Sequence, residues 1–159
     1  DGGFSWITYS GQNFFRSQGA GMHNISSSPT LMNNRFYDNS AAIEGGAMEN
    51  KNSSVLTISN CDFYDNTANI GAAMSNVDFS SAIINNSRFY DNVATNHGGA
   101  LYNYNCSPMI MNSDFHHNTA SNNGGSIYNN FASVNINNSN FHDNEASYGG
   151  AIFSNQSHQ

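Results

Sequence analysis

Charged residues are scarce in this sequence, and cations are the scarcest of all. The 159 residues include 4 Lys or Arg against 11 Asp or Glu, which gives a formal net charge of −7 and a charged fraction of 9%. Proteins that bind nucleic acids or anionic membranes present clusters of Lys and Arg, and this sequence has no such cluster. We therefore expect no nucleic acid partner.

Long apolar runs are missing as well. A helix that crosses a bilayer needs about 20 mainly apolar residues, and the sequence contains no run of that kind. We therefore predict no transmembrane segment. The chain begins at Asp1 with neither a Met nor a signal peptide, which favours a mature product or an excised fragment.

What the sequence has in abundance is a repeat. Its first half is an F-x-x-N motif that occurs five times at nearly constant spacing. An alanine follows two positions after each Asn, and a run of small residues such as GGALYN (Gly98–Asn103) closes the unit. The motifs begin at Phe36, Phe63, Phe89, Phe115 and Phe141. A fixed period of about 26 residues is typical of a solenoid.

Each repeat carries three short apolar anchors separated by polar residues, as in Ile84, Phe89 and Leu101. Each anchor is too short for a helix, whose apolar residues recur at a spacing near 3.6 over about ten or more residues. Apolar and polar residues instead alternate, as around Val134 and Ile136, and a period of two indicates β-strand. We therefore predict an all-β fold, a right-handed parallel β-helix with three sides and about six coils, which stack at ~4.8 Å.

One solenoid fills the chain, so we expect a single domain over residues 1–159. Residues 18–159 hold the repeats, whereas residues 1–17 depart from them and form either a degenerate first coil or an N-terminal cap. One regular period back from Phe36, the first Phe position falls on Ser10. No amphipathic helix follows the last repeat, so the C-terminal coil is expected to be bare.

Stacking of similar coils places the same side chains above one another. We predict an interior column of the five phenylalanines and a second column of aliphatic residues (Leu31, Ile58, Ile84, Ile110 and Ile136). Asn side chains in register can hydrogen-bond along the axis as amide ladders. One ladder comprises Asn39, Asn66, Asn92, Asn118 and Asn144, and the second comprises Asn50, Asn76, Asn103 and Asn129. The small residues of each run, such as Gly99, are expected to allow close backbone approach.

An acidic column lies two positions after the phenylalanines, at Asp38, Asp65, Asp91 and Asp143, with His117 in the remaining repeat. Like charges at this spacing raise one another's pKa unless a cation relieves them. One hypothesis is a ladder of bound calcium ions, although one carboxylate per coil supplies few of the roughly six to eight oxygens that calcium takes. The other hypothesis is that these side chains cap turns.

A second chemically active cluster comprises His116, His117, His142 and Asp143. Imidazoles from neighbouring coils that bind a transition metal are one interpretation. The other is that His replaces Tyr in an outward stack that begins with Tyr37, Tyr64 and Tyr90.

We predict no catalytic residue and no cofactor-binding residue. The alternation of Arg35, Asp62, Arg88 and Asp114 just before the phenylalanines indicates charge balancing on the surface.

The separation of the two cysteines, Cys61 and Cys106, is not a multiple of the period. They should lie on different faces of different coils, so we expect no disulfide between them. Cys61 stands two positions before a Phe, where the other repeats have Asn or Ser, and it is expected to be a small inward filler.

The pairing of F-x-x-N with GGA and an aliphatic residue resembles the repeats of chlamydial polymorphic outer-membrane proteins, and more widely those of right-handed β-helix proteins. The matching pieces are FYDN, FYDN, FYDN, FHHN and FHDN with GGAM, GAAM, GGAL, GGSI and GGAI, which cover nearly all of Leu31–Ile152. The resemblance implies a β-helix and an adhesin-like passenger displayed at the cell surface. An extracellular or cell-surface location is therefore expected.

The leading functional hypothesis is a non-enzymatic structural protein that self-assembles into a surface filament, sheath or coat. The unpaired strands at the two ends of a β-helix behave as sheet edges, and a contact that is translational along the axis does not close. Copies would associate head to tail, with Phe4–Phe15 docking on the Phe141–Phe153 coil of the preceding subunit.

Two further hypotheses follow from the same repeats. One is an adhesin or glycan-binding passenger module with surface glycans as its partner. The other is a carbohydrate-active β-helix enzyme, although the known lyases of this fold resemble the chain poorly. Their sites grow from long irregular loops, whereas the loops here are uniform.

Overall fold

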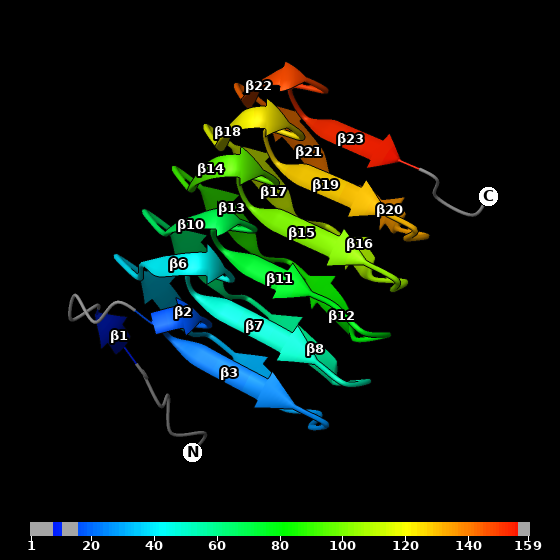
Figure 1. Cartoon of the computed structure of the whole chain (residues 1–159). Helices are drawn as coiled ribbons and strands as arrows, with labels where there is room; N and C mark the ends of the chain where they lie inside the picture. The colour runs from blue at the N-terminus through cyan, green and yellow to red at the C-terminus, as the bar shows by residue number, and fades with distance from the viewer. Residues whose placement is uncertain (1–7, 11–15, 156–159) are drawn as a thin grey trace.

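The chain folds into a stack of short parallel β-strands (Figure 1). The structure is a computed structural model that describes residues 8–10 and 16–155. The described residues form 23 strands in four sheets, which we name A to D, and each strand pairs with the equivalent strand one coil away. The predicted parallel β-helix is confirmed.

Sheets A and B hold the F-x-x-N motif and the residues that follow it. Sheet A comprises β1 (Thr8–Ser10), β5 (Arg35–Tyr37), β9 (Asp62–Tyr64), β13 (Arg88–Tyr90), β17 (Asp114–His116) and β21 (Asn140–His142). Sheet B comprises β2 (Arg16–Gln18), β6 (Ala41–Glu44), β10 (Thr67–Ile70), β14 (Val93–His97), β18 (Thr119–Asn123) and β22 (Glu145–Tyr148).

Sheets C and D hold the small-residue runs and the aliphatic anchors. Sheet C faces the viewer in Figure 1 and comprises β3 (Met22–Ile25), β7 (Met48–Lys51), β11 (Met74–Asn76), β15 (Leu101–Tyr104), β19 (Ile127–Asn130) and β23 (Ile152–Asn155). Sheet D comprises β4 (Thr30–Met32), β8 (Val55–Ser59), β12 (Ser81–Asn85), β16 (Met109–Met111) and β20 (Asn135–Asn137). The described strands thus form the coils β4–β7 to β20–β23, preceded by β1, β2 and β3.

Each complete coil has four strands, whereas three were expected from the apolar anchors. The difference arises between the aliphatic anchor and the Phe, where Asn86 adopts a left-handed conformation (φ 48°) and separates β12 from β13. The alanine after the Asn, such as Ala94, also faces inward and gives sheet B a core column of its own. Four inward positions therefore define four sides.

Left-handed residues mark the corners of every coil. The corner between sheets D and A is occupied by Asn33, Asn60, Asn86, Asn112 and Asn138, with φ between 47° and 57°. The corner between sheets B and C is occupied by the first Gly of each small-residue run, for example Gly98 with φ 63°. Gly adopts this conformation without steric cost and Asn with little, which explains why both residues recur at fixed positions.

The predicted Phe column fills the interior. Phe36, Phe63, Phe89 and Phe115 are fully buried, and rings in successive coils, ending with Phe141, stack with centroids 4.7–4.8 Å apart and planes within 10°. The aliphatic column of sheet D lies beside it, with Ile58, Ile84 and Ile110 fully buried.

The F-x-x-N asparagines form the predicted amide ladder, with nitrogen to oxygen distances of 2.9–3.0 Å between successive side chains. In the middle of the ladder, Asn92 Nδ2 donates to Asn118 Oδ1 and to the Phe63 carbonyl, while Asn92 Oδ1 accepts from the side chain and the backbone N–H of Asn66. Both amide protons and the oxygen of Asn92 are therefore satisfied inside the fold. Such satisfaction makes a buried polar column compatible with stability.

A second amide ladder and the column of Cys61 add further polar groups to the interior. The ladder in sheet C joins Asn24, Asn50, Asn76, Asn103 and Asn129 at 2.8–2.9 Å. In the column of Cys61, backbone N–H groups donate to the side chain of the equivalent residue in the next coil. The distance from Cys61 N to Ser87 Oγ is 3.1 Å. Cys61 is thus a buried filler that also accepts a hydrogen bond, from Asn34 N at 3.5 Å. Both cysteines are free, as expected.

The described part of the N-terminal segment continues two of the sheets. β1 pairs with β5 and places Tyr9 opposite Phe36, so the first Phe position is Tyr9 and the prediction of Ser10 was wrong by one position. The step from Tyr9 to Phe36 therefore equals the step from Phe36 to Phe63, and both are one position longer than the later steps. β2 pairs with β6. The rest of the Phe4–Phe15 segment lies outside the described residues.

Candidate functional site

The chemically active side chains predicted from the sequence lie on the outer face of sheet A. The residues directly after the phenylalanines point outward and stack with ring centroids 4.9–5.1 Å apart. This stack comprises Tyr37, Tyr64, Tyr90, His116 and His142. His116 and His142 thus continue the tyrosine stack. This confirms the interpretation that His replaces Tyr in an outward stack.

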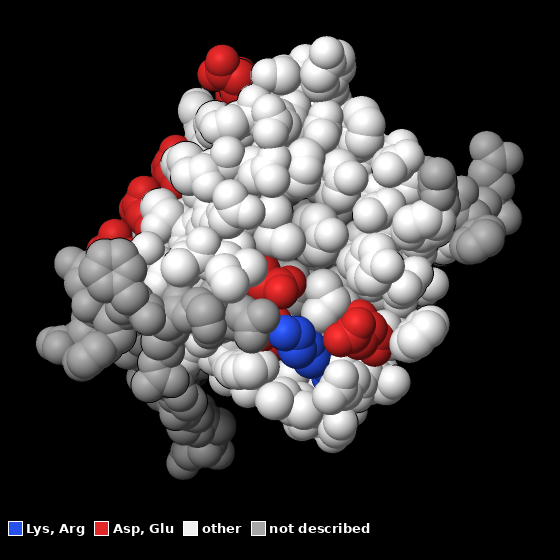
Figure 2. All heavy atoms as spheres, in the orientation of Figure 1, with Lys and Arg blue, Asp and Glu red and all other residues white. Residues whose placement is uncertain are grey.

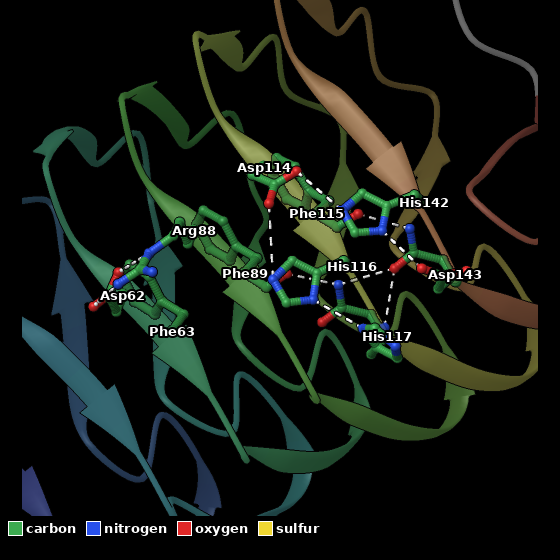
Figure 3. Close-up of polar contacts among 12 residues, drawn as sticks. Asp62, Phe63, Arg88, Phe89, Asp114, Phe115, His116, His117, His142 and Asp143 are labelled. Atoms are coloured by element: carbon green, nitrogen blue, oxygen red, sulfur yellow. Dashed lines mark hydrogen bonds and ion pairs between the residues drawn. The ribbon is translucent and has the colours of Figure 1, made fainter.

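The structure brings all four candidate metal ligands together, next to Asp114 on β17 (Figure 3). Asp114 Oδ2 lies 3.7 Å from His116 Nε2, and Asp114 Oδ1 lies 3.5 Å from His142 Nε2. On the opposite edge of the rings, His116 Nδ1 is 3.0 Å from His117 Nδ1, and His142 Nδ1 is 2.8 Å from Asp143 Oδ2.

These contacts join neighbouring side chains in pairs and do not converge on one point. Among the residues that the structure describes, no group of three or more His, Cys, Asp or Glu side chains is placed to hold a metal ion. The transition-metal interpretation of the cluster therefore has no support from the geometry, whereas the calcium interpretation of the acidic column, which would need backbone and Asn oxygens as ligands, stays a hypothesis. What the arrangement can do chemically is take up and release protons.

The carboxylate of Asp143 makes His142 more basic. The hydrogen bond between them raises the pKa of His142 above its ordinary 6.5 and lowers the pKa of Asp143 below its ordinary 3.8. The stabilisation by protonated His142 is therefore fully present below pH 6.5 and is lost as the pH rises through the raised pKa. The contribution of Asp143 is present above pH 3.8 and is lost as the pH falls through the lowered pKa.

Replacing Asp143 by Asn should lower the pKa of His142 toward its ordinary value, because the charged hydrogen-bond acceptor is removed. An NMR titration of the imidazole protons measures this pKa directly. Asp91→Asn is the matched control, since it removes a carboxylate from the same corner position two coils away, and it should leave His142 unchanged. Equal His142 pKa values in Asp143→Asn and the parent would contradict the assigned contact.

The acidic column owes its position to the backbone. Asp38, Asp65, Asp91, His117 and Asp143 form the corner between sheets A and B, all with φ between 52° and 54°. Asp tolerates the left-handed region better than most side chains do. Asp65 lies between Asp38 and Asp91 in this column, and burial together with the charges of Asp91 and Asp38 raises its pKa. These residues lie at a turn, and the capping of that turn by their side chains stays a hypothesis.

A polar groove follows the corner between sheets D and A. Its volume is about 440 Å³, and its lining includes Asn amides of the corner and the alternating charges before the phenylalanines. Arg88 donates from Nε and Nη2 to the two carboxylate oxygens of Asp62, each at 2.8 Å. Arg35 approaches the same carboxylate at 3.6 Å. The alternating column therefore balances its charges by pairing between coils, as predicted.

A buried ion-pair network on the outer face of sheet C was not predicted from the sequence. Glu49 is fully buried, and its carboxylate oxygens lie 2.6 Å from Lys51 Nζ and 2.9 Å from His23 Nε2. Lys51 Nζ is also 4.0 Å from Glu44, which accepts a hydrogen bond of 2.9 Å from Ser75. The sequence carried one indication of this network. In the run GGAMEN, Glu49 stands between Met48 and Asn50, which both face inward.

Residues 84–104 match the Chlamydia polymorphic membrane protein repeat. The matched segment begins on β12 and ends with β15, so it contains one Phe position, one rung of each amide ladder and one small-residue run. This chain is a parallel β-helix repeat protein that resembles the chlamydial polymorphic membrane proteins. No curated protein and no solved structure matches the chain. The described residues contain no helix long and apolar enough to cross a membrane.

Proposed function

We propose that the protein is a non-enzymatic, surface-associated structural solenoid that assembles head to tail into a filament, sheath or coat. The observation that carries the proposal is the continuity of its side-chain columns. The Phe stack and the F-x-x-N amide ladder run unbroken from Phe36 and Asn39 to Phe141 and Asn144. The surface location rests on the matched repeat.

The last described coil offers a template for this growth. Strands β20, β21, β22 and β23 each pair with one neighbouring strand among the described residues. Their other edges present backbone N–H and C=O groups in the spacing of the next coil, which is the property of an edge strand. Phe141 and Ile152 are partly buried there, and Ile136 is 36% exposed. A second copy stacked on this coil would extend the columns, and the contact would be open-ended.

The proposal of a non-enzymatic role rests on the uniformity of the coils. Corner residues repeat at the same positions in successive coils, and no long loop interrupts the strands between Met22 and Asn155. With 4 cations in the whole chain, nucleic acid is not proposed as a partner.

Sedimentation velocity over a range of concentrations tests the assembly. The parent chain should give sedimentation coefficients that rise continuously with concentration. Ile136→Lys places an ammonium group on the inward column of the last coil and should give a monomer. Asn135→Lys adds the same charge on the outward face of the same strand and should assemble like the parent. A parent chain that is strictly monomeric at high micromolar concentration would contradict the proposal.

The polar groove between sheets D and A favours a second candidate, an adhesin or glycan-binding module. Its Asn amides, the Asp62 carboxylate and the Arg88 guanidinium are groups that hydrogen-bond sugar hydroxyls. Binding of glycans by the parent that is lost in Asn86→Ala would support this function. Glycan binding at this groove would not depend on assembly.

A further inference from the structure

The outer face of sheet C carries an aromatic stack that stops in mid-array. Tyr102 stacks on Tyr128 with centroids 5.5 Å apart and planes within 7°, and Tyr128 stacks in turn on Phe153 at 5.6 Å. In the preceding coil the register partner of Tyr102 is Ser75, whose side chain is too small to continue the stack. Because the Tyr102 ring is nearly parallel to that of Tyr128, its other face is directed toward the coil of Ser75.

A cavity lies beside this interruption, where Glu44 covers the fully buried Ser75 and accepts its hydrogen bond at 2.9 Å. The neighbouring outward column runs from Lys51 to Val77 to Tyr104, so the same coil again carries a shorter side chain than the coil that follows. The cavity has a volume of about 280 Å³. It is lined by Tyr102, Tyr104, Val77, Ile70 and the charged residues Glu44, Lys51 and Asp78. We call it the sheet C trough. Burial raises the pKa of Tyr102 to about 12, so its phenol stays neutral.

Negative charge dominates the floor and wall of the sheet C trough. Glu44, Lys51 and Asp78 line it, and Glu49 lies against Lys51 beneath. Three carboxylates against one ammonium give a formal charge of −2 for these four residues, with His23 counted as neutral. On the face shown in Figure 2, basic atoms lie beside acidic atoms, and most of the surrounding surface is uncharged. Anionic ligands are therefore disfavoured, and a cation is favoured.

We propose that the sheet C trough binds a guanidinium group, the side chain of an Arg on a partner polypeptide. A guanidinium is planar, so it can lie against the rings of Tyr102 and Tyr104 that line the cavity. Its N–H groups can then donate to the carboxylates of Asp78 and Glu44, which line the same cavity. An ammonium group matches the charge but has no planar face to lie against the rings. A neutral sugar matches neither the charge nor the carboxylate pair.

This inference goes beyond the proposed assembly and is tested independently of it. The lining of the trough comes from β6, β7, β10, β15 and the turn after β11, away from the last coil, so binding can be measured on both the parent and Ile136→Lys. NMR titration with acetyl-Gly-Arg-Gly-amide should give saturable shifts of the Tyr102 and Tyr104 ring signals, with a Kd on the order of 1 mM. The same peptide with citrulline, a neutral isostere of Arg, should bind at least about tenfold more weakly.

Two variants assign the binding to the trough. Asp78→Asn should weaken the Arg peptide about tenfold, the effect of one charge-assisted hydrogen bond. Asp78 is exposed at a left-handed corner that Asn also tolerates, so the variant should fold. Asp91→Asn removes an equal charge from a corner outside the trough and should leave binding unchanged. Equal binding of the Arg and citrulline peptides, an unchanged Kd in Asp78→Asn, or no saturable binding would overturn the proposal. Ring shifts caused by methyl hexosides instead would overturn it in favour of a glycan.

Discussion

Phe89→Ala should lower the free energy of unfolding by about 3 to 5 kcal/mol. Phe89 is fully buried, and its ring stacks on Phe63 and Phe115 with both centroid distances at 4.7 Å. Neither neighbouring coil can close the resulting cavity, because each is held in register by parallel strand pairs on both sides. The cost therefore includes the lost stacking as well as the lost burial.

Urea denaturation monitored by circular dichroism measures this change. Tyr90→Ala is the matched control, because Tyr90 is the next residue on β13 and stacks at 4.9 Å on Tyr64, yet it lies on the outer face and is only partly buried. It should cost markedly less than Phe89→Ala. Similar losses for the two variants would show that the column of phenylalanines is not the main support of the fold.

Gly99→Val should abolish folding of the middle coils. A Cβ atom at Gly99 would lie 2.0 Å from the Gly125 carbonyl oxygen and 2.8 Å from both the backbone nitrogen and the carbonyl oxygen of Thr119. These are backbone atoms within strand-paired coils, so they cannot move aside as a flexible side chain would. The backbone of Gly99 itself is not left-handed, so the cause is crowding. This agrees with the close approach expected for the small-residue runs.

Gly150→Val provides the matched control for this second prediction. Gly150 occupies the same position in the last coil, where the one close contact of an added Cβ is the Asn144 carbonyl oxygen at 3.0 Å. The variant should keep a cooperative thermal transition, whereas Gly99→Val should lose it. A Gly99→Val protein that melts like the parent would refute the crowding argument. Ala72 stands at the equivalent position of the preceding coil, where β10 has 4 residues against 5 in β14.

The period, the Phe column and both amide ladders could be predicted because each depends on one residue type at a fixed spacing. A parallel stack turns such spacing directly into contact. The F-x-x-N asparagines in particular are invariant over the five repeats. Their ladder follows from their position alone.

The fourth side of the coil could not be predicted in the same way. The corner between sheets D and A is made by residues such as Asn86, and nothing in a sequence with so many asparagines separates a corner Asn from a ladder Asn like Asn92. Tyr9 was misplaced because the first coil is one position longer than the regular period that was used to extrapolate from Phe36.

The sheet C trough escaped prediction because it arises from differences between coils. Its column reads His23, Glu49, Ser75, Tyr102 and Tyr128, with no residue type repeated until the last two. A repeat pattern reports what successive coils share. Beside the cavity, Ser75 ends a stack that only the following coils carry, and recognising this requires the register to be known.

Electron microscopy and fibre diffraction of the concentrated chain test the central claim most directly. If subunits stack coil on coil, the material should form unbranched filaments with a ~4.8 Å reflection along the filament axis, the spacing between successive coils. The Ile136→Lys variant should form none, while Asn135→Lys should form filaments like the parent. Dispersed monomers of the parent at high micromolar concentration, or filaments whose ~4.8 Å reflection lies across the axis, would contradict head-to-tail assembly of the solenoid.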